Sequence, residues 1–229
     1  RYVGLSNFSQ SDVSKMMQYI SVDCQQSLYN MLERNPTSYH GIPLDYRTEK
    51  EVLPNVREYG QAFLPYSPLF QGLLAGKFKD GIHLAEDDIR QANPKLSGEE
   101  AQIYWTAAEK LREISDRLGR PMSHLALNWL RQKPEVTSII NGASSVVQVK
   151  DNLSSVEWNI DEATMNEIAN KIKNSVQETN GVKPNVIVLM SESFWDITRV
   201  KELGFKEELF PTYRNLQKTS LTGELLTNV

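Results

Sequence analysis

The chain has 229 residues, with 25 Lys and Arg against 29 Asp and Glu, a net charge of -4 and a pI near 5.5. This balance, without a run of five like charges, argues against a nucleic-acid partner, and no apolar run approaches the ~20 residues of a membrane span. A single cysteine, Cys24, excludes an internal disulfide framework and a cysteine-based metal cluster, and it fits a reducing, cytoplasmic location.

The first part of the chain alternates short apolar runs with a helical pattern. Residues 1–5 predict a strand, and Ser9 with Asp12 three residues later predicts a helix that continues through Tyr19. A second short strand is expected over residues 20–26. The first residue is Arg rather than Met, which is consistent with a start inside a longer protein.

A third strand and its loop form the centre of the pattern. Residues 47–59 carry apolar side chains on one helical face, and Gly60 is a helix stop. The apolar strand that follows ends at Tyr66 and Ser67, before a glycine-punctuated loop. Parallel α/β proteins bind ligands at the carboxyl ends of their strands, so a ligand site is expected here.

The loop over residues 78–96 is polar and has no helical pattern. Its carboxylates and imidazole are more typical of a solvated loop than of a metal site; they are His83, Glu86, Asp87 and Asp88. His40 and His124 are interpreted as isolated side chains.

The remaining elements are two helices, a strand and a capped helix. Helices are predicted over residues 97–118 and 122–131, and a strand over 136–140. Ser145 and Gln148 then have capping-box spacing, so the free N–H groups of this helix start favour an anion. A last helix is expected over residues 161–173.

Four phrases in this order resemble the aldo-keto reductases. They are G-x-S-N-F at residues 4–8, Q-x-x-Y-N at 26–30, Y-S-P-L-x-x-G-L-L-x-G-K at 66–77, and I-x-G-A-x-S-x-x-Q-x-x-D-N-L at 140–153. Each phrase also has a plain structural interpretation, as a packed strand with an ordinary turn or as a capped surface helix. The resemblance covers residues 1–173.

The resemblance implies a nicotinamide cofactor, NADP or alternatively NAD. It places Ser6, Asn7 and Gln26 at the carboxamide, Tyr66 against the nicotinamide ring, Ser67 and Leu69 at the pyrophosphate, and Gly142, Ser144, Gln148, Asp151 and Asn152 at the adenosine end. An amide ligand needs both donors and acceptors, which Asn and Gln side chains offer together. Many members carry Lys or Arg near the Gly142 and Gln148 positions, so the neutral residues here keep NAD open.

The implied fold is α/β, a partial (β/α)8 TIM barrel of about strands 5–8. The implied activity is carbonyl reduction by hydride transfer, with NADP(H) and a small carbonyl compound as partners. The family's catalytic groups, a Tyr proton donor tuned by Lys with Asp and His beside it, belong to its first half. We therefore assign no catalytic residue, and a non-catalytic nucleotide-binding chain is an alternative function.

After residue 173 the composition changes. Residues 174–184 predict a linker, and residues 185–229 predict the first fragment of a second α/β domain. Residues 182–229 resemble the start of lipoteichoic-acid-synthase-like phosphoglycerol transferases of the sulfatase and alkaline-phosphatase type. That resemblance implies that Glu192 is a ligand for manganese or another divalent metal, although a lone carboxylate at a strand end is the commoner interpretation. It also gives an alternative function, that of a fragment of a metal-dependent transferase.

The predicted half barrel has open sheet edges, because a barrel removes its edges only by closing. We therefore expect the chain to self-associate, most simply as a dimer that completes a barrel, or to be loosely packed.

Overall fold

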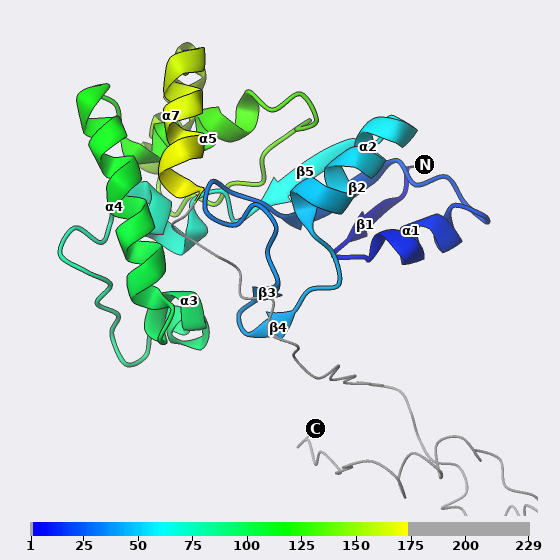
Figure 1. Cartoon of the computed structure of the whole chain (residues 1–229), viewed down its shortest axis with the longest axis horizontal. Coiled ribbons are helices and arrows are strands. Elements are labelled where there is room, and N and C mark those ends of the chain that lie inside the picture. Colours follow the sequence, from blue (N-terminus) through cyan, green and yellow to red (C-terminus); the bar gives the residue numbers. More distant parts are fainter. Residues whose placement is uncertain (1, 174–229) are drawn as a thin grey trace, which may run out of the picture. The chain divides into compact units, whose positions relative to one another are not determined.

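The strands of the computed structural model, which describes residues 2–173, pair in parallel and in chain order. The sheet runs β1 (Gly4–Ser6), β2 (Cys24–Leu28), β5 (Ala62–Tyr66), and Figure 1 shows these strands side by side. The connections between them carry helices, as parallel pairing requires. The α/β prediction is confirmed, and all described residues belong to one compact unit.

Residues 136–140 continue the sheet beyond β5, but by two isolated bridges rather than by the predicted strand. Val136 pairs with Phe63, and Ile140 pairs with Tyr66. Between them, Thr137 N donates to Phe63 O at 3.0 Å, while the N–H of Phe63 donates to the hydroxyl Oγ1 of Thr137 at 3.2 Å. Because a side chain replaces a backbone carbonyl at this rung, the regular ladder is interrupted.

The close approach of β1 to β2 depends on a glycine. A Cβ atom at Gly4 would lie 2.5 Å from Sγ of Cys24, the residue that it pairs with. Any side chain at position 4 would therefore push the two strands apart or displace the thiol.

Within residues 2–173, seven α-helices follow or connect these strands. They are α1 (Gln10–Met16), α2 (Leu53–Tyr59), α3 (Pro94–Ser97), α4 (Ala101–Arg117), α5 (Met122–Arg131), α6 (Val146–Ser154) and α7 (Glu162–Ile172). The predicted starts of α1, α6 and α7 are confirmed, since Ser9, Ser145 and Asp161 each accept the backbone N–H three residues later. Gly60 ends α2 in the left-handed conformation, at φ 62°.

The second strand begins later than predicted, at Cys24 instead of residue 20. The carbonyl of Met16 accepts from Tyr19 N at 2.9 Å and from Ile20 N at 3.0 Å, so these residues finish the turn after α1. Tyr19 is 83% exposed, and the apolar run that it begins does not enter the sheet at once.

Several short elements have no strong sequence signal. A two-stranded antiparallel hairpin joins β3 (Ser38–Tyr39) to β4 (Ile42–Pro43). A π-helical segment, Thr48–Val52, precedes α2, and 3-10 helices lie at Phe70–Ala75, Ile89–Ala92 and Ser155–Glu157. The predicted glycine loop after β5 and the predicted loop over 78–96 are therefore partly helical.

One apolar core joins the sheet to the later helices, and Figure 1 shows α4, α5 and α7 gathered together. Tyr29 lies at its centre, with ring centroids 6.0 Å from Phe63 and 5.3 Å from Trp129 of α5. The apolar pattern of α4 buries Leu111 completely, whereas Ile103 is 48% exposed.

No helix within residues 2–173 is long and apolar enough to cross a bilayer. The predicted linker 174–184, the sulfatase-like segment 182–229 with its fragment 185–229, and the candidate ligand Glu192 lie outside the described residues.

Candidate functional site

Predicted residues from three parts of the chain meet at the carboxyl edge of the sheet. Ser6 pairs with Gln26, and Leu28 pairs with Tyr66, so β1, β2 and β5 end close together. Asn7 N donates to Gln26 O at 3.0 Å, which continues the β1–β2 pairing one residue past the strand. Gln26 is half-buried, whereas Ser6 and Asn7 are exposed at this edge.

Asn7 is held in an unusual conformation by two tyrosines. Its backbone has φ 61°, and its Oδ1 accepts hydrogen bonds from the hydroxyls of Tyr46 at 2.7 Å and Tyr66 at 3.0 Å. The Tyr46 hydroxyl in turn accepts from Leu28 N at 3.0 Å. Burial raises the pKa of Tyr46 and that of Tyr66, so both phenols stay protonated donors.

This arrangement fixes which end of the Asn7 amide faces outward. Because both hydroxyls point at Oδ1, the amide Nδ2 carries the two protons that remain for another group. A donor at an exposed strand end can hold a carbonyl oxygen of a ligand. Tyr46 was not predicted, because it lies 39 residues from Asn7 in a segment without a motif.

Ser67 begins the loop after β5 in the left-handed conformation, at φ 54°. Asn30 Nδ2 donates to Ser67 O at 3.1 Å, and the Tyr39 hydroxyl lies 3.4 Å from Ser67 Oγ. The rings of Tyr39 and Tyr66 meet edge to face, with centroids 5.4 Å apart. The hairpin that carries Tyr39 therefore contacts the predicted site directly.

The loop continues with strongly turned backbone. Leu69 is half-buried, and its carbonyl accepts from Gly72 N at 2.9 Å and from Leu74 N at 3.1 Å. Gln71 has φ 51°, and its side chain bridges His40 and Asn93 at 2.8 Å each. His40 is therefore not isolated, contrary to the prediction.

A second group of predicted residues follows the bridged segment. Ile140 N donates to Pro65 O at 2.9 Å, which brings residue 141 next to the end of β5. Gln148 Oε1 accepts from Ser144 N at 2.7 Å and from Ser144 Oγ at 3.0 Å. Gly142 is exposed, with open space around the position of a Cβ atom.

The last two predicted residues lie on α6. Asp151 Oδ1 lies 3.1 Å from Nε2 of His124 on α5, and Ser123 Oγ is 3.4 Å from Asp151 Oδ2. His124 is buried, with 6% of its surface exposed. Because it contacts Asp151, the prediction that it is isolated is also wrong. Asn152 is half-buried, and its backbone carbonyl accepts from the Ser155 hydroxyl at 2.6 Å.

A hollow of about 470 Å³ lies beside the loop after β5 and was not predicted. Its lining is mostly cationic or polar and consists of Lys77, Phe78, Lys79, Asp80, Gly81, His83 and Arg90. Arg90 is also bonded to Asp88 and donates from Nη1 to Gln71 O at 3.2 Å. The charges of Lys77, Lys79 and Arg90 are partly balanced by Asp80 in the lining and by Asp88, which pairs with Arg90.

No group of three or more His, Cys, Asp or Glu side chains within residues 2–173 is placed to hold a metal ion.

Comparison with known proteins identifies a family and several relatives. The sequence profile of the Aldo/keto reductase family matches residues 1–173. An L-glyceraldehyde 3-phosphate reductase from Escherichia coli K12 is 28% identical over 166 residues, which cover 68% of this chain and 44% of that protein. The aldo-keto reductase YhdN from Bacillus subtilis is 25% identical over 182 residues, 79% of this chain and 51% of that protein.

Two further comparisons extend this result. An NADH-specific methylglyoxal reductase from E. coli K12 is 27% identical over 173 residues, 71% of this chain and 46% of that protein. The structure of a glycerol dehydrogenase from Gluconobacter oxydans superposes with a TM-score of 0.65 at 22% identity, covering 82% of this chain and 53% of the other. The chain thus spans about half the length of the curated relatives that it matches.

Proposed function

Since the chain belongs to the Aldo/keto reductase family, we propose that residues 1–173 bind a nicotinamide cofactor for the reduction of a small carbonyl compound. The cofactor, when bound, supplies the hydride for this chemistry. NADP(H) is the proposed form, and NAD(H) is the alternative. The relatives include reductases of L-glyceraldehyde 3-phosphate and of methylglyoxal, which supports a small carbonyl substrate.

The orientation of the Asn7 amide is the observation that carries the proposal. Tyr46 and Tyr66 donate to its Oδ1, so its Nδ2 protons face outward. A carboxamide oxygen needs such a donor, and the half-buried Gln26 one strand away offers both a donor and an acceptor for the carboxamide nitrogen and oxygen. We assign Ser6 to the same group.

Tyr66 is proposed to support the flat nicotinamide ring. Its hydroxyl is held by Asn7 and its ring edge by Tyr39, so the ring is fixed before a ligand arrives. A fixed aromatic surface orients a planar ligand at low entropic cost. Ser67 and Leu69 follow directly and are proposed for the pyrophosphate.

The adenosine end is assigned to the second group. The α6 start with Ser144 and Gln148 provides N–H groups and polar side chains, and Asp151 is held in place by His124. Gly142 and Asn152 complete this proposed set. The neutral residues at the start of α6 leave NAD as the alternative to the proposed NADP.

The described residues bind and orient in this proposal; no proton donor is assigned among them. A carbonyl oxygen needs a proton as the hydride arrives, and that step requires a positioned acid. Experiment must therefore distinguish a reductase from a chain that binds a nucleotide without catalysis.

We also propose that residues 1–173 are about strands 5–8 of a barrel, with residues 174–184 a linker to a separate C-terminal segment. β1 pairs only with β2 in the described sheet, which leaves its other edge open. The α6 helix exposes Val146, Val147 and Leu153 at 70%, 76% and 65%. The open edge of β1 and, at a separate place, the exposed apolar side chains of α6 support self-association.

Titration of the full chain with NADPH and, separately, NADH tests the proposed function through the change in nicotinamide fluorescence. Saturable binding of either dinucleotide with a Kd below about 1 mM supports it. Absence of binding for both dinucleotides would contradict it. Oxidation of bound NADPH by a panel of small aldehydes then separates a reductase from a binding chain.

A further inference from the structure

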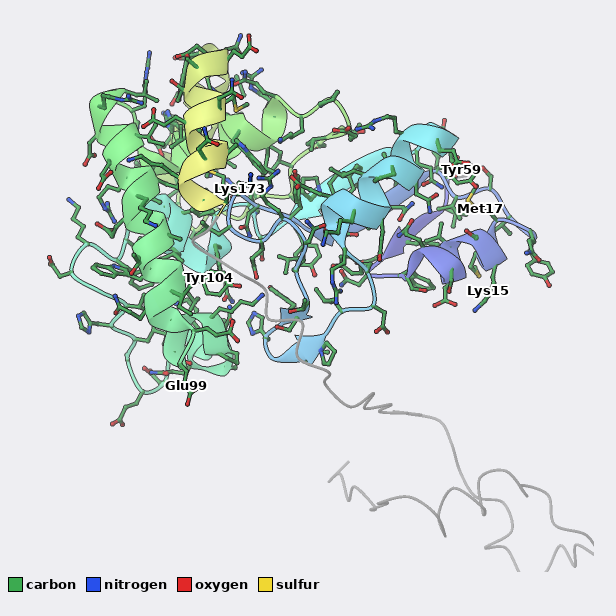
Figure 2. All side chains as sticks on the ribbon, viewed as in Figure 1. Lys15, Met17, Tyr59, Glu99, Tyr104 and Lys173 are labelled. Carbon is green, nitrogen blue, oxygen red and sulfur yellow. The ribbon has the colours of Figure 1, made fainter. Side chains whose placement is uncertain are left out.

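An ammonium group and a carboxylate are buried together near the loop that follows β5. Lys95 of α3 and Glu33 have side chains that are 5% and 3% exposed, and Nζ lies 2.8 Å from Oε1. Nζ also donates to the backbone carbonyl of Ser38 at 2.9 Å, and it lies 5.6 Å from the ring of Tyr104, labelled in Figure 2 on α4. The ammonium thus has a hydrogen-bond or aromatic partner for each of its three protons.

The first connection from this ammonium reaches Ser67 through Glu33 and Asn30. Glu33 Oε2 accepts from Asn30 Nδ2 at 2.8 Å, and the same nitrogen donates to Ser67 O at 3.1 Å. Asn30 cannot turn its amide over without loss, because its Oδ1 accepts from the backbone N–H groups of Leu32 at 3.0 Å and Glu33 at 2.9 Å. Its Nδ2 is therefore directed at the carboxylate and at Ser67.

The second connection runs through the hairpin. Lys95 fixes the carbonyl of Ser38 in β3, and the next residue, Tyr39, brings its hydroxyl to 3.4 Å from Ser67 Oγ. The two connections end on different atoms of the same residue. Ser67 needs such support, because its φ of 54° is unfavourable for a residue other than glycine.

We propose that Lys95 is a positioning residue for the cofactor-binding loop: its buried ammonium holds both supports of Ser67 and so maintains the loop in its binding conformation. This inference rests on the proposed function, since Ser67 is assigned there to the pyrophosphate. A buried ion pair alone often adds little stability over apolar side chains of similar size. The role proposed for Lys95 therefore lies in the hydrogen bonds that lead from the pair to Ser67.

The test compares two double variants that both remove the buried charges. Glu33→Leu with Lys95→Met replaces the pair by apolar groups and breaks both connections. Glu33→Gln with Lys95→Met removes the ammonium from both connections but keeps an amide oxygen that accepts from Asn30, so only the connection through Asn30 retains part of its hydrogen bonding. Each full-length variant is examined for its melting temperature, for NADPH affinity, and for hydrogen exchange of the Phe70 amide without cofactor.

The exchange measurement needs no ligand. The Phe70 amide donates to Ser67 O at 3.1 Å, so its protection reports on the position of that carbonyl. We expect exchange about tenfold faster in the Leu/Met variant than in the parent, and NADPH affinity about tenfold weaker, with the Gln/Met variant between them. A purely structural pair would instead give affinities that follow the melting temperatures.

Unchanged Phe70 exchange in a folded Leu/Met variant would overturn the inference. If exchange accelerates but the parent chain binds no dinucleotide, the positioning role stands and the proposed function fails. If the double variants do not fold, Tyr39→Phe decides, because it removes only the hydroxyl beside Ser67. Tyr59→Phe, at the exposed end of α2 in Figure 2, is its control, and equal Phe70 exchange in both would refute the second connection.

Discussion

The hydroxyl of Tyr46 donates a 2.7 Å hydrogen bond to Oδ1 of Asn7, across 39 residues of sequence. The same hydroxyl accepts from a buried backbone N–H, that of Leu28, at 3.0 Å. One phenol thereby ties a β2 amide to the residue after β1. Substitutions of Asn7 and of Tyr46 distinguish the contribution of this contact to cofactor binding from its contribution to stability.

Replacing Asn7 by Asp is expected to weaken NADPH binding about tenfold while leaving the fold intact. Aspartate keeps an oxygen that accepts from both tyrosines, but it has no N–H to donate outward. Fluorescence titration gives the affinity, and thermal melting checks the fold. Equal affinities for Asn7→Asp and the parent chain would show that the outward amide has no role.

Tyr46→Phe is expected to lower the free energy of unfolding by about 1–3 kcal/mol. The variant leaves the N–H of Leu28 buried without its acceptor and removes one donor from Asn7. Tyr19→Phe is the matched control, since Tyr19 is 83% exposed and its loss of a hydroxyl is expected to stay within about 0.5 kcal/mol. Urea unfolding of both variants measures the difference, and a Tyr46→Phe value as small as the control would contradict the prediction.

Gly4→Ala is expected to destabilise the chain by about 1–3 kcal/mol, because the new methyl group would lie 2.5 Å from the Cys24 thiol. The double variant Gly4→Ala with Cys24→Ala should regain most of that loss, since the clash is with Sγ. Gly142→Ala is a control for the added methyl, because nothing lies within 4 Å of its Cβ position. Failure of Cys24→Ala to rescue stability would place the strain elsewhere.

The Asp88 carboxyl is expected to titrate at about pH 2, because hydrogen bonds from the Arg90 side chain and backbone lower its pKa from 3.8. With the folded pKa below the unfolded value, its contribution to stability is present above about pH 4 and is lost as the pH falls toward 2. Arg90→Gln should raise the pKa of Asp88 but leave it below 3.8, since the backbone N–H of residue 90 still donates to Asp88 Oδ1 at 2.9 Å. Carboxyl NMR shifts measure both midpoints; an unmoved midpoint would exclude the guanidinium as the cause.

The sequence correctly predicted those helix starts and ends that depend on residues close together in the chain. Ser9, Ser145 and Asp161 each cap the helix that follows, and Gly60 ends α2 where a left-handed residue was expected. The order of β1, β2, β5 and the 136–140 segment agrees with the barrel that the family resemblance implies, in which successive strands are neighbours.

The supports of the candidate site could not be predicted in the same way. Lys95 contacts Glu33 and Ser38 across 62 and 57 residues, and a lysine in a polar loop gives no sign that its ammonium is buried. Tyr39 lies on a hairpin of two-residue strands, which is too short for a periodic pattern. Such contacts depend on how distant segments pack, which composition and spacing do not encode.

The hydroxyl of Thr137 stands in for a backbone carbonyl where the 136–140 segment meets β5. Thr137 N still donates to Phe63 O through the backbone, but the second bond of this rung exists only while position 137 has a side-chain acceptor. Thr137→Val, which keeps the shape, would delete it alone. The segment that leads to the proposed adenosine group is thus attached to β5 partly through a side chain, so one substitution would weaken this attachment while its backbone bonds to Phe63 and Pro65 remain.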